Sequence, residues 1–211
     1  DLAPRQIGDP QNAAERLPRD LCVGDFDGDQ VPDVWIANEG ASTAIHHLVL
    51  GQRRPLAPLG AVHRVSVAPG AWKCVAARFD GDSLPDVLLV PGPNAPVGLR
   101  PQVLLARPVG PGAPAFAPAF ELPLAPLAYE AVEVADLDGD LFLDVAVVSG
   151  STNQLGVAWG LGDGTFQATA PVAFTVPGYT PDAASTAVGL HACRNGGLQS
   201  LAVVHAGQIG R

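Results

Sequence analysis

The chain has 211 residues, including 24 Gly and 21 Pro, and 47% of its residues are hydrophobic. This apolar content excludes a disordered chain, and the frequent turn residues favour many short strands. The net charge of -9 excludes the basic surface that nucleic-acid binding requires. No apolar run reaches the roughly 18 residues that cross a membrane, so we expect no membrane span. Together these observations predict an all-β protein without a nucleic-acid partner.

The first predicted unit covers residues 18–67 and contains the acidic stretch 25–33, DFDGDQVPD. An apolar strand enters this turn and a second apolar strand leaves it. Two less hydrophobic strands follow, and adjacent His46 and His47 should point to opposite faces of the first of these. The four predicted strands have the sequences LCVG, DVWIA, AIHHLVL and AVHRVSV.

The same order recurs in residues 68–122 and 123–176, around the acidic turns RFDGDSLPD and DLDGDLFLD. The second unit adds the strands CVAA, DVLLV, PQVLLA and AFAPAFEL, and the third adds VEVA, DVAVV, LGVAWGL and FQATAPVAF. In the fourth unit, residues 177–211, the stretch ACRNGGLQSLAVVH keeps the glycine turn and the apolar strand but has no carboxylates.

The spacing of these turns indicates a repeat architecture. The central Asp27, Asp80 and Asp138 are 53 and 58 residues apart, a period typical of propellers and arrays. Strands that grade from buried to exposed within a unit match a blade of a β-propeller, whose inner strands line the axis. We expect one domain over residues 1–211 that is a four-bladed ring, part of a larger propeller, or a half that pairs with a partner. Residues 1–17 either complete the last blade or mark a truncation.

The motif DxDGDxxxDV, together with GVAWGLGDGTFQ at 156–167, resembles the FG-GAP/VCBS repeats of integrin α-subunits and many secreted bacterial proteins. The resemblance implies a propeller with calcium in the loop between the first two strands of a blade. It also implies secretion, and the chain, which begins with Asp1 and has no Met, is expected to be a processed form or an excised fragment. The family's propellers have about seven blades, whereas four units fit here.

Calcium takes about six to eight oxygen ligands in flexible geometry. Side chains at positions 1, 3, 5 and 9 of a tight turn, with the carbonyl of position 7, supply such a set. Zinc would need His or Cys, which these turns lack, and magnesium would need a stricter octahedron. The predicted ligands are Asp25, Asp27, Asp29, Asp33 and the Val31 carbonyl in the first unit, and Asp136, Asp138, Asp140, Asp144 and the Phe142 carbonyl in the third.

The second unit departs from this pattern because Arg78 replaces the first aspartate. Asp80, Asp82 and Asp86 remain, with the Leu84 carbonyl. Two interpretations stay open: calcium binds weakly with water in the vacant position, or the Arg78 guanidinium pairs with the aspartates instead of a metal. We therefore predict two calcium ions, leave a third open in this unit, and expect none in the fourth.

Calcium here is predicted to be structural, and no catalytic motif supports an enzyme. The face opposite the acidic turns offers aromatic and amide groups that suit a glycan or a protein loop. The alternative is that these aromatic side chains cap the core. We expect a secreted binding or adhesion module. The alternatives are a lectin and a structural or assembly domain of a larger extracellular protein or filament, and self-association stays open. The candidate ligand residues are Trp72, Tyr129, Tyr179, Asn38, Asn94 and Asn153.

The cysteines leave two arrangements open. In the first, Cys22 and Cys74 form a disulfide and Cys193 stays unpaired. In the second, all three cysteines are buried free thiols, and the sequence favours neither arrangement.

Overall fold

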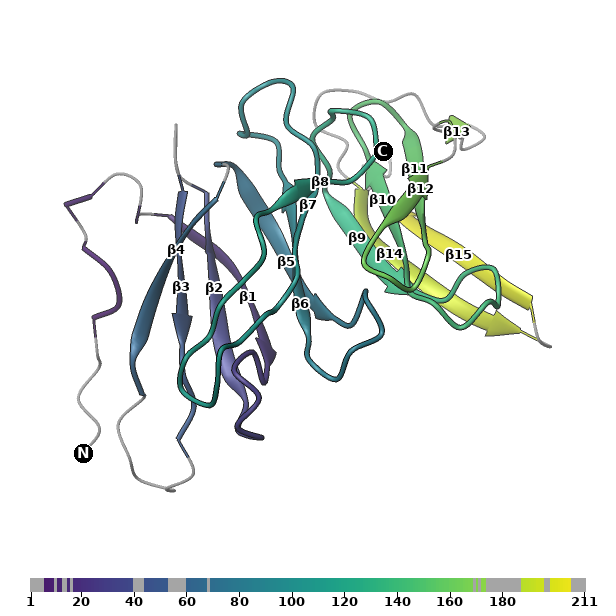
Figure 1. Cartoon of the computed structure of the whole chain (residues 1–211). Coiled ribbons are helices and arrows are strands. Elements are labelled where there is room, and N and C mark those ends of the chain that lie inside the picture. The colour runs from purple at the N-terminus through teal and green to yellow at the C-terminus, as the bar shows by residue number, and fades with distance from the viewer. Residues whose placement is uncertain are drawn as a thin grey trace.

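The computed structural model describes residues 6–9, 11, 12, 15, 17–39, 44–52, 60–67, 69–168, 170, 172, 173, 187–195 and 198–205. Within this part of the chain every regular element is a strand, which confirms the all-β class (Figure 1). None of the described residues belongs to a helix long and apolar enough to span a membrane.

The strands form antiparallel sheets in which consecutive strands are neighbours. The first sheet consists of β1 (Pro18–Gly24), β2 (Asp33–Asn38), β3 (Ala44–Val49) and β4 (Val62–Val67). The second sheet consists of β5 (Ala71–Ala77), β6 (Asp86–Pro91), β7 (Gln102–Leu104) and β8 (Phe120–Glu121). Each acidic turn therefore joins the first two strands of a sheet, as the repeat predicts.

The third sheet repeats this order with β9 (Ala131–Ala135), β10 (Asp144–Ser149), β11 (Gln154–Gly160) and β12 (Phe166–Ala168), and β13 (Val172–Ala173) also pairs with β11. The hairpin of β14 (Ala187–Asn195) and β15 (Leu198–His205) follows. All residues of β6 and β10 are buried. Their near-continuous apolar sequences are explained by burial on both faces of the sheet.

One predicted strand is much shorter than expected. The sequence predicts a strand over 115–122, but β8 contains only two residues. Pro114 and Pro118 lack the N–H group that a strand donates to its neighbour. The segment before β8 instead touches the extension of β7 through an isolated bridge between Ala106 and Phe116.

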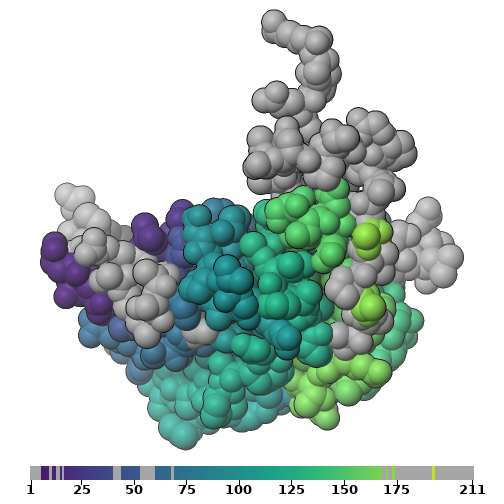
Figure 2. Space-filling view, turned by 90° about the horizontal axis from the view of Figure 1, so that it is seen from above, coloured from purple at the N-terminus to yellow at the C-terminus, as the bar shows by residue number. Residues whose placement is uncertain are grey.

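The sheets lie in a row in which their first strands touch. β1 contacts β5, β5 contacts β9, and β9 contacts β14, and Figure 2 shows the row from above, from the first sheet in purple and blue to the third in green. One core, which includes Trp35 and Leu89, fills the space between the first and second sheets. A second, which includes Leu88 and Val147, fills the space between the second and third. Within the described residues the row does not close into a ring.

The described part of the N-terminal segment lies on the first sheet. The buried carboxylate of Glu15 is 3.1 Å from Nε2 of His47 on β3 and 3.3 Å from Nε of Arg64 on β4. It also accepts hydrogen bonds from the Asp9 N–H and the Asn12 amide. Burial raises the pKa of Glu15, but these hydrogen bonds and the Arg64 charge outweigh it and lower the pKa to about 2. That residues 1–17 complete the last blade stays a prediction.

The first core also contains Cys22 and Cys74, both buried and both free thiols. A hydrogen bond with Cys22 and burial raise the pKa of the Cys74 thiol. The structure thus has no disulfide between them, and the side chain of Cys193 lies outside its described part.

The two adjacent histidines of β3 do point to opposite faces. His46 is fully buried and stacks on Trp35 at 5.7 Å, while His47 faces Glu15. Burial, and secondarily the neighbouring His47, lower the pKa of His46 to about 4. Between pH 6.5 and 4 the unfolded chain therefore binds a proton at His46 that the folded chain excludes.

We expect the free energy of unfolding to fall as the pH falls through this window, by up to about 3 kcal/mol from His46 alone. His46→Gln removes that titration while its amide oxygen can still accept the Asn38 N–H now accepted by Nδ1. Urea unfolding at about pH 7 and pH 4.5 should show a drop that is smaller in the variant by about 2 kcal/mol. Equal drops in both proteins would contradict this explanation.

Candidate metal centres at the acidic turns

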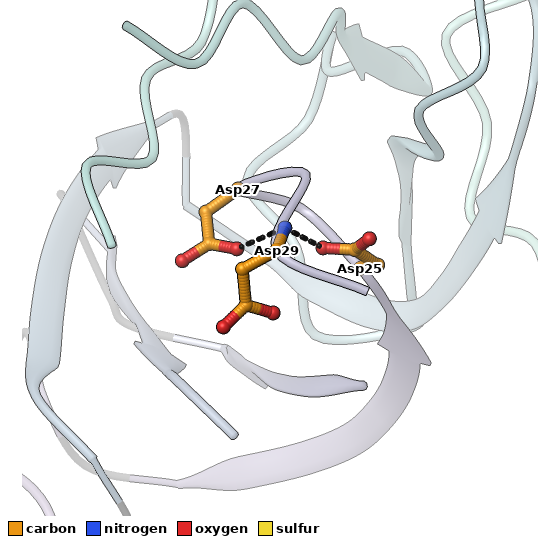
Figure 3. A group of neighbouring side chains, drawn as sticks. All are labelled: Asp25, Asp27 and Asp29. Carbon is orange, nitrogen blue, oxygen red and sulfur yellow. Dashed lines mark hydrogen bonds between the residues drawn. The ribbon is translucent and has the colours of Figure 1, made fainter. Parts of the chain in front are cut away.

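In the first turn three aspartates converge around one point. Asp25, Asp27 and Asp29 each offer an oxygen, and these atoms lie within 4.8 Å of one another (Figure 3). The carboxylate of Asp25 accepts the N–H groups of Gly28 and Asp29 at 2.8 and 3.0 Å. Gly28 adopts a φ of 77°, a left-handed conformation that glycine takes without strain. The backbone therefore wraps around the carboxylates and holds like charges together.

The loop between β7 and β8, residues 105–119, reaches this turn from the second sheet. The Gly112 N–H donates to Oδ2 of Asp27 at 2.7 Å, and Asp27 is 2% exposed. Farther along the loop, Phe116 packs on Phe26, inside the turn, and on Trp35 of β2. The first candidate metal centre is therefore built from groups of two neighbouring sheets.

The third turn brings together a slightly different set. Asp136, Asp138 and Asp144 place one oxygen each within 4.8 Å of one another. Asp136 accepts the Gly139 N–H at 2.7 Å, as Asp25 does with Gly28. Asp140 lies in the same turn but outside this triad, and its carboxylate accepts the Phe142 N–H at 2.8 Å.

The last aspartate of each turn has a further role that the sequence reasoning missed. Asp33, Asp86 and Asp144 are all buried. Each accepts one N–H from the start of its own turn and one from the end of the third strand or the segment just after it. For Asp86 these donors are the N–H groups of Phe79 and Ala106, at 2.8 and 2.9 Å. The signal in the sequence was that this position keeps its aspartate in all three turns, while the first position does not.

Burial raises the pKa of all three of these carboxyl groups, against the opposing effect of the backbone hydrogen bonds. For Asp86 the pKa reaches about 6. A bound cation next to such a group would favour its ionised form.

The second turn contains a guanidinium, but it belongs to Arg107 and not to Arg78. Arg107, just after β7, contacts Oδ2 of Asp80 at 2.5 Å and Oδ2 of Asp82 at 3.4 Å. It also donates to the Ala106 carbonyl at 2.7 Å. Arg78 is exposed. The aspartates of this turn do not form a group like the two above among the described residues.

Removing Arg107 should destabilise this turn measurably. We expect Arg107→Gln to lower the free energy of unfolding by about 1 kcal/mol, because the pair is partly exposed and the two aspartates would then repel each other. Arg78→Gln is the matched control, since it removes an exposed arginine from the same turn. Urea unfolding measures both, and an equal or larger effect of Arg78→Gln would show that Arg107 does not hold the turn.

The neighbouring sheet also touches the second turn. The Gly164 N–H, in the turn between β11 and β12, donates to the Phe79 carbonyl at 3.0 Å. Thus, at two places among the described residues, the loop between the third and fourth strands of one sheet contacts the acidic turn of the sheet before it.

Three of the predicted ligand-face residues are engaged within the protein. Tyr129 is 1% exposed and its hydroxyl donates to the Ala125 carbonyl. Asn38 is also 1% exposed and its amide donates to the Ile45 carbonyl. Trp72 is half-buried beneath the Arg19 guanidinium, 4.9 Å from the ring centre. Tyr129 and Asn38 therefore cannot present themselves to a ligand here.

The other three candidates do not complete a surface site. Asn94 is exposed, and Asn153 is half-buried with a left-handed φ of 51°. Tyr179 lies outside the described residues. The structure brings together the predicted metal ligands much more clearly than the predicted ligand face.

Models of known protein families give no match to the chain, and neither do the curated proteins. The fold and the site define an all-β protein of four-stranded antiparallel sheets with two groups of carboxylates that could hold a metal ion.

Proposed function

We propose that the chain is a secreted, non-catalytic binding module of the β-propeller type, stabilised by two calcium ions. The observation that carries the proposal is the pair of carboxylate groups at equivalent turns, Asp25–Asp27–Asp29 and Asp136–Asp138–Asp144. The propeller is supported by the successive contacts of the first strands of neighbouring sheets. The repeated contact between a loop of one sheet and the acidic turn of the sheet before it supports the same arrangement.

Calcium fits these groups better than the other common divalent metals. The ligand atoms on offer are oxygens, which excludes the sulfur and nitrogen sites that zinc prefers. The turns add backbone carbonyls and water access, and calcium tolerates the resulting irregular geometry where magnesium demands an octahedron. Two ions would change the net charge from -9 to -5.

A third ion is not part of the proposal. In the second turn Arg107 already supplies a positive charge to Asp80 and Asp82, and it makes the contacts that a cation would make. The interpretation in which calcium and water fill this turn is therefore less favoured than pairing with a guanidinium, although that guanidinium belongs to Arg107 and not to Arg78.

A structural role for the ions follows from what surrounds them. Asp25 and Asp27 accept hydrogen bonds from backbone N–H groups of their own turn, and Asp27 accepts a further one from the Gly112 N–H of the second sheet. Metal binding at such a turn would fix the connection between β1 and β2 and the contact with the 105–119 loop. A protein or glycan partner would then be recognised by loops on a scaffold of fixed geometry.

The proposal is tested by isothermal titration calorimetry, in which calcium is added to protein that a chelator has freed of metal. Native mass spectrometry then counts the bound ions. Two ions should bind, and Asp27→Asn with Asp138→Asn should abolish both. Asp163→Asn is the matched control because Asp163 is an exposed acid of the third sheet outside both groups. No calcium binding, or binding unaffected by the double variant, would refute the proposed centres.

A further inference from the structure

One face of the first sheet is left open by the other described sheets. Leu21 and Val23 of β1 are 59% and 52% exposed, and Ile36 of β2 is half-buried beside them. A shallow hollow of about 430 Å³ lies here, lined by Pro18, Arg19, Asp20, Leu21 and Ile36. We call the surface of Leu21, Val23 and Ile36 the leading face. Adjacent exposed apolar side chains of this kind mark an interaction surface.

The repeat shows what this surface is built to contact. With the acidic turns aligned, Leu21 corresponds to Cys74 of β5 and to Val132 of β9. Cys74 is 6% exposed and belongs to the core against the first sheet, while Val132 packs into the core against the second. This position thus packs on the preceding sheet wherever a preceding sheet is present.

The other two positions follow the same rule. Val23 corresponds to Ala76 and Val134, and each of these packs into the core shared with the sheet before. Ile36 corresponds to Leu89 and Val147, which are 4% and 0% exposed. The leading face therefore has the apolar side chains that elsewhere in the chain pack on a preceding sheet, but no described sheet precedes it.

The described residues of the N-terminal segment cover the outer half of the same side of the first sheet. His47, directly opposite Ile36 in the register of β2 and β3, faces Glu15, as does Arg64 on β4. The part that the described residues leave uncovered therefore has the width of the two strands β1 and β2. An occupant must be narrower than a four-stranded sheet.

The β14–β15 hairpin has this width, since its two strands pair only with each other among the described strands. Within its own chain it packs against β9 and β10, at the opposite end of the row from the first sheet (Figure 1). Its place in the repeat is that of the sheet after the third, so its outer side would be the one that contacts a following first sheet.

We propose that the leading face binds the β14–β15 hairpin of a second copy of this chain, head to tail. Such a heterologous contact closes into a ring when the rotation permits and otherwise continues as a filament. Two copies would place eight units in a ring, within the range of about four to eight blades that propellers adopt. The proposal goes beyond calcium binding and does not depend on it.

Light scattering after size exclusion, with calcium present throughout, tests the association. The mass should rise from 21.6 kDa to twice that value or more over about a hundredfold range of concentration. Leu21→Asp with Val23→Asp should weaken the association at least about tenfold. Val97→Asp with Val109→Asp is the matched control, since both valines are exposed in loops of the second sheet, and it should change nothing.

Photo-crosslinking identifies the occupant. A photoreactive residue at position 21 in a mixture of ¹⁴N- and ¹⁵N-labelled chains should give mixed-isotope crosslinks to residues 187–205. A monomer at every concentration would overturn the proposal, and so would an unchanged mass in Leu21→Asp with Val23→Asp. Crosslinks within one copy would mean that the chain's own hairpin covers the face, and crosslinks between two leading faces would mean a head-to-head dimer; both overturn it.

Discussion

Removal of calcium is expected to lower the melting temperature of this protein by about 10 °C or more. An ion that binds only the folded chain contributes about 2.7 kcal/mol at a hundredfold excess over its dissociation constant. Two such ions contribute about 5 kcal/mol, and about 2–4 °C accompany each kcal/mol in a domain of this size. Without the ions, the three carboxylates within each group repel one another, while the fold holds their oxygens within 4.8 Å.

Calorimetry with calcium and with a chelator measures this shift. Asp27→Asn with Asp138→Asn should melt at the same temperature in both solutions, because the ions have lost a ligand in each group. Asp163→Asn should keep the full difference. If a chelator does not change the melting temperature of the wild-type protein, the structural role of calcium is refuted.

Trp35→Ala should cause the largest loss of stability among single substitutions in the first sheet. Trp35 is fully buried and its ring packs against Phe26, Phe116 and His46. Truncation of a buried aromatic side chain to alanine typically removes about 4 kcal/mol through lost burial and the cavity left behind. The melting temperature should therefore fall by about 10 °C.

The same substitution should affect one metal centre and not the other. Phe26 lies inside the first turn and packs on Trp35 with ring centres 6.3 Å apart, so that turn loses support. The third turn does not contact this cluster through any of the described rings. Calcium titration should show one site weakened about tenfold, equivalent to about 1.4 kcal/mol, and one unchanged.

Trp35→Phe provides the milder variant if the alanine variant does not fold, and Trp72→Ala serves as the control. Trp72 is half-buried outside this cluster, so both calcium sites should keep their affinity. Equal weakening of both sites in the Trp35 variants would indicate a global loss of structure rather than loss of support for the first turn.

The sequence predicted the strands that flank the acidic turns because two signals coincide there. The glycine and aspartates define the turn, and uninterrupted apolar residues on each side define strands buried on both faces. The strands β2, β6 and β10 begin at the last aspartate, as expected. Where the signal is weaker, as in the proline-rich segment before β8, the sequence predicts a longer strand than the two residues of β8.

The convergence of Asp25, Asp27 and Asp29 was predictable because it depends on residues close together in the chain. The contacts of Arg107 and Glu15 were not, since their partners are distant in sequence and no period relates them. Arg78 looked like the countercharge because it occupies a motif position, but the side chain that enters the turn comes from after β7. Local patterns do not specify such long-range partners.

The 105–119 loop has a consequence for how far the repeats can act as modules. It donates the Gly112 N–H to Asp27 of the first repeat and carries Arg107 to Asp80 of its own. A first repeat transplanted into another protein would arrive without the donor to Asp27, and a deletion of the second repeat would take that donor away. Neighbouring repeats in this chain are therefore not interchangeable, although their acidic turns look alike.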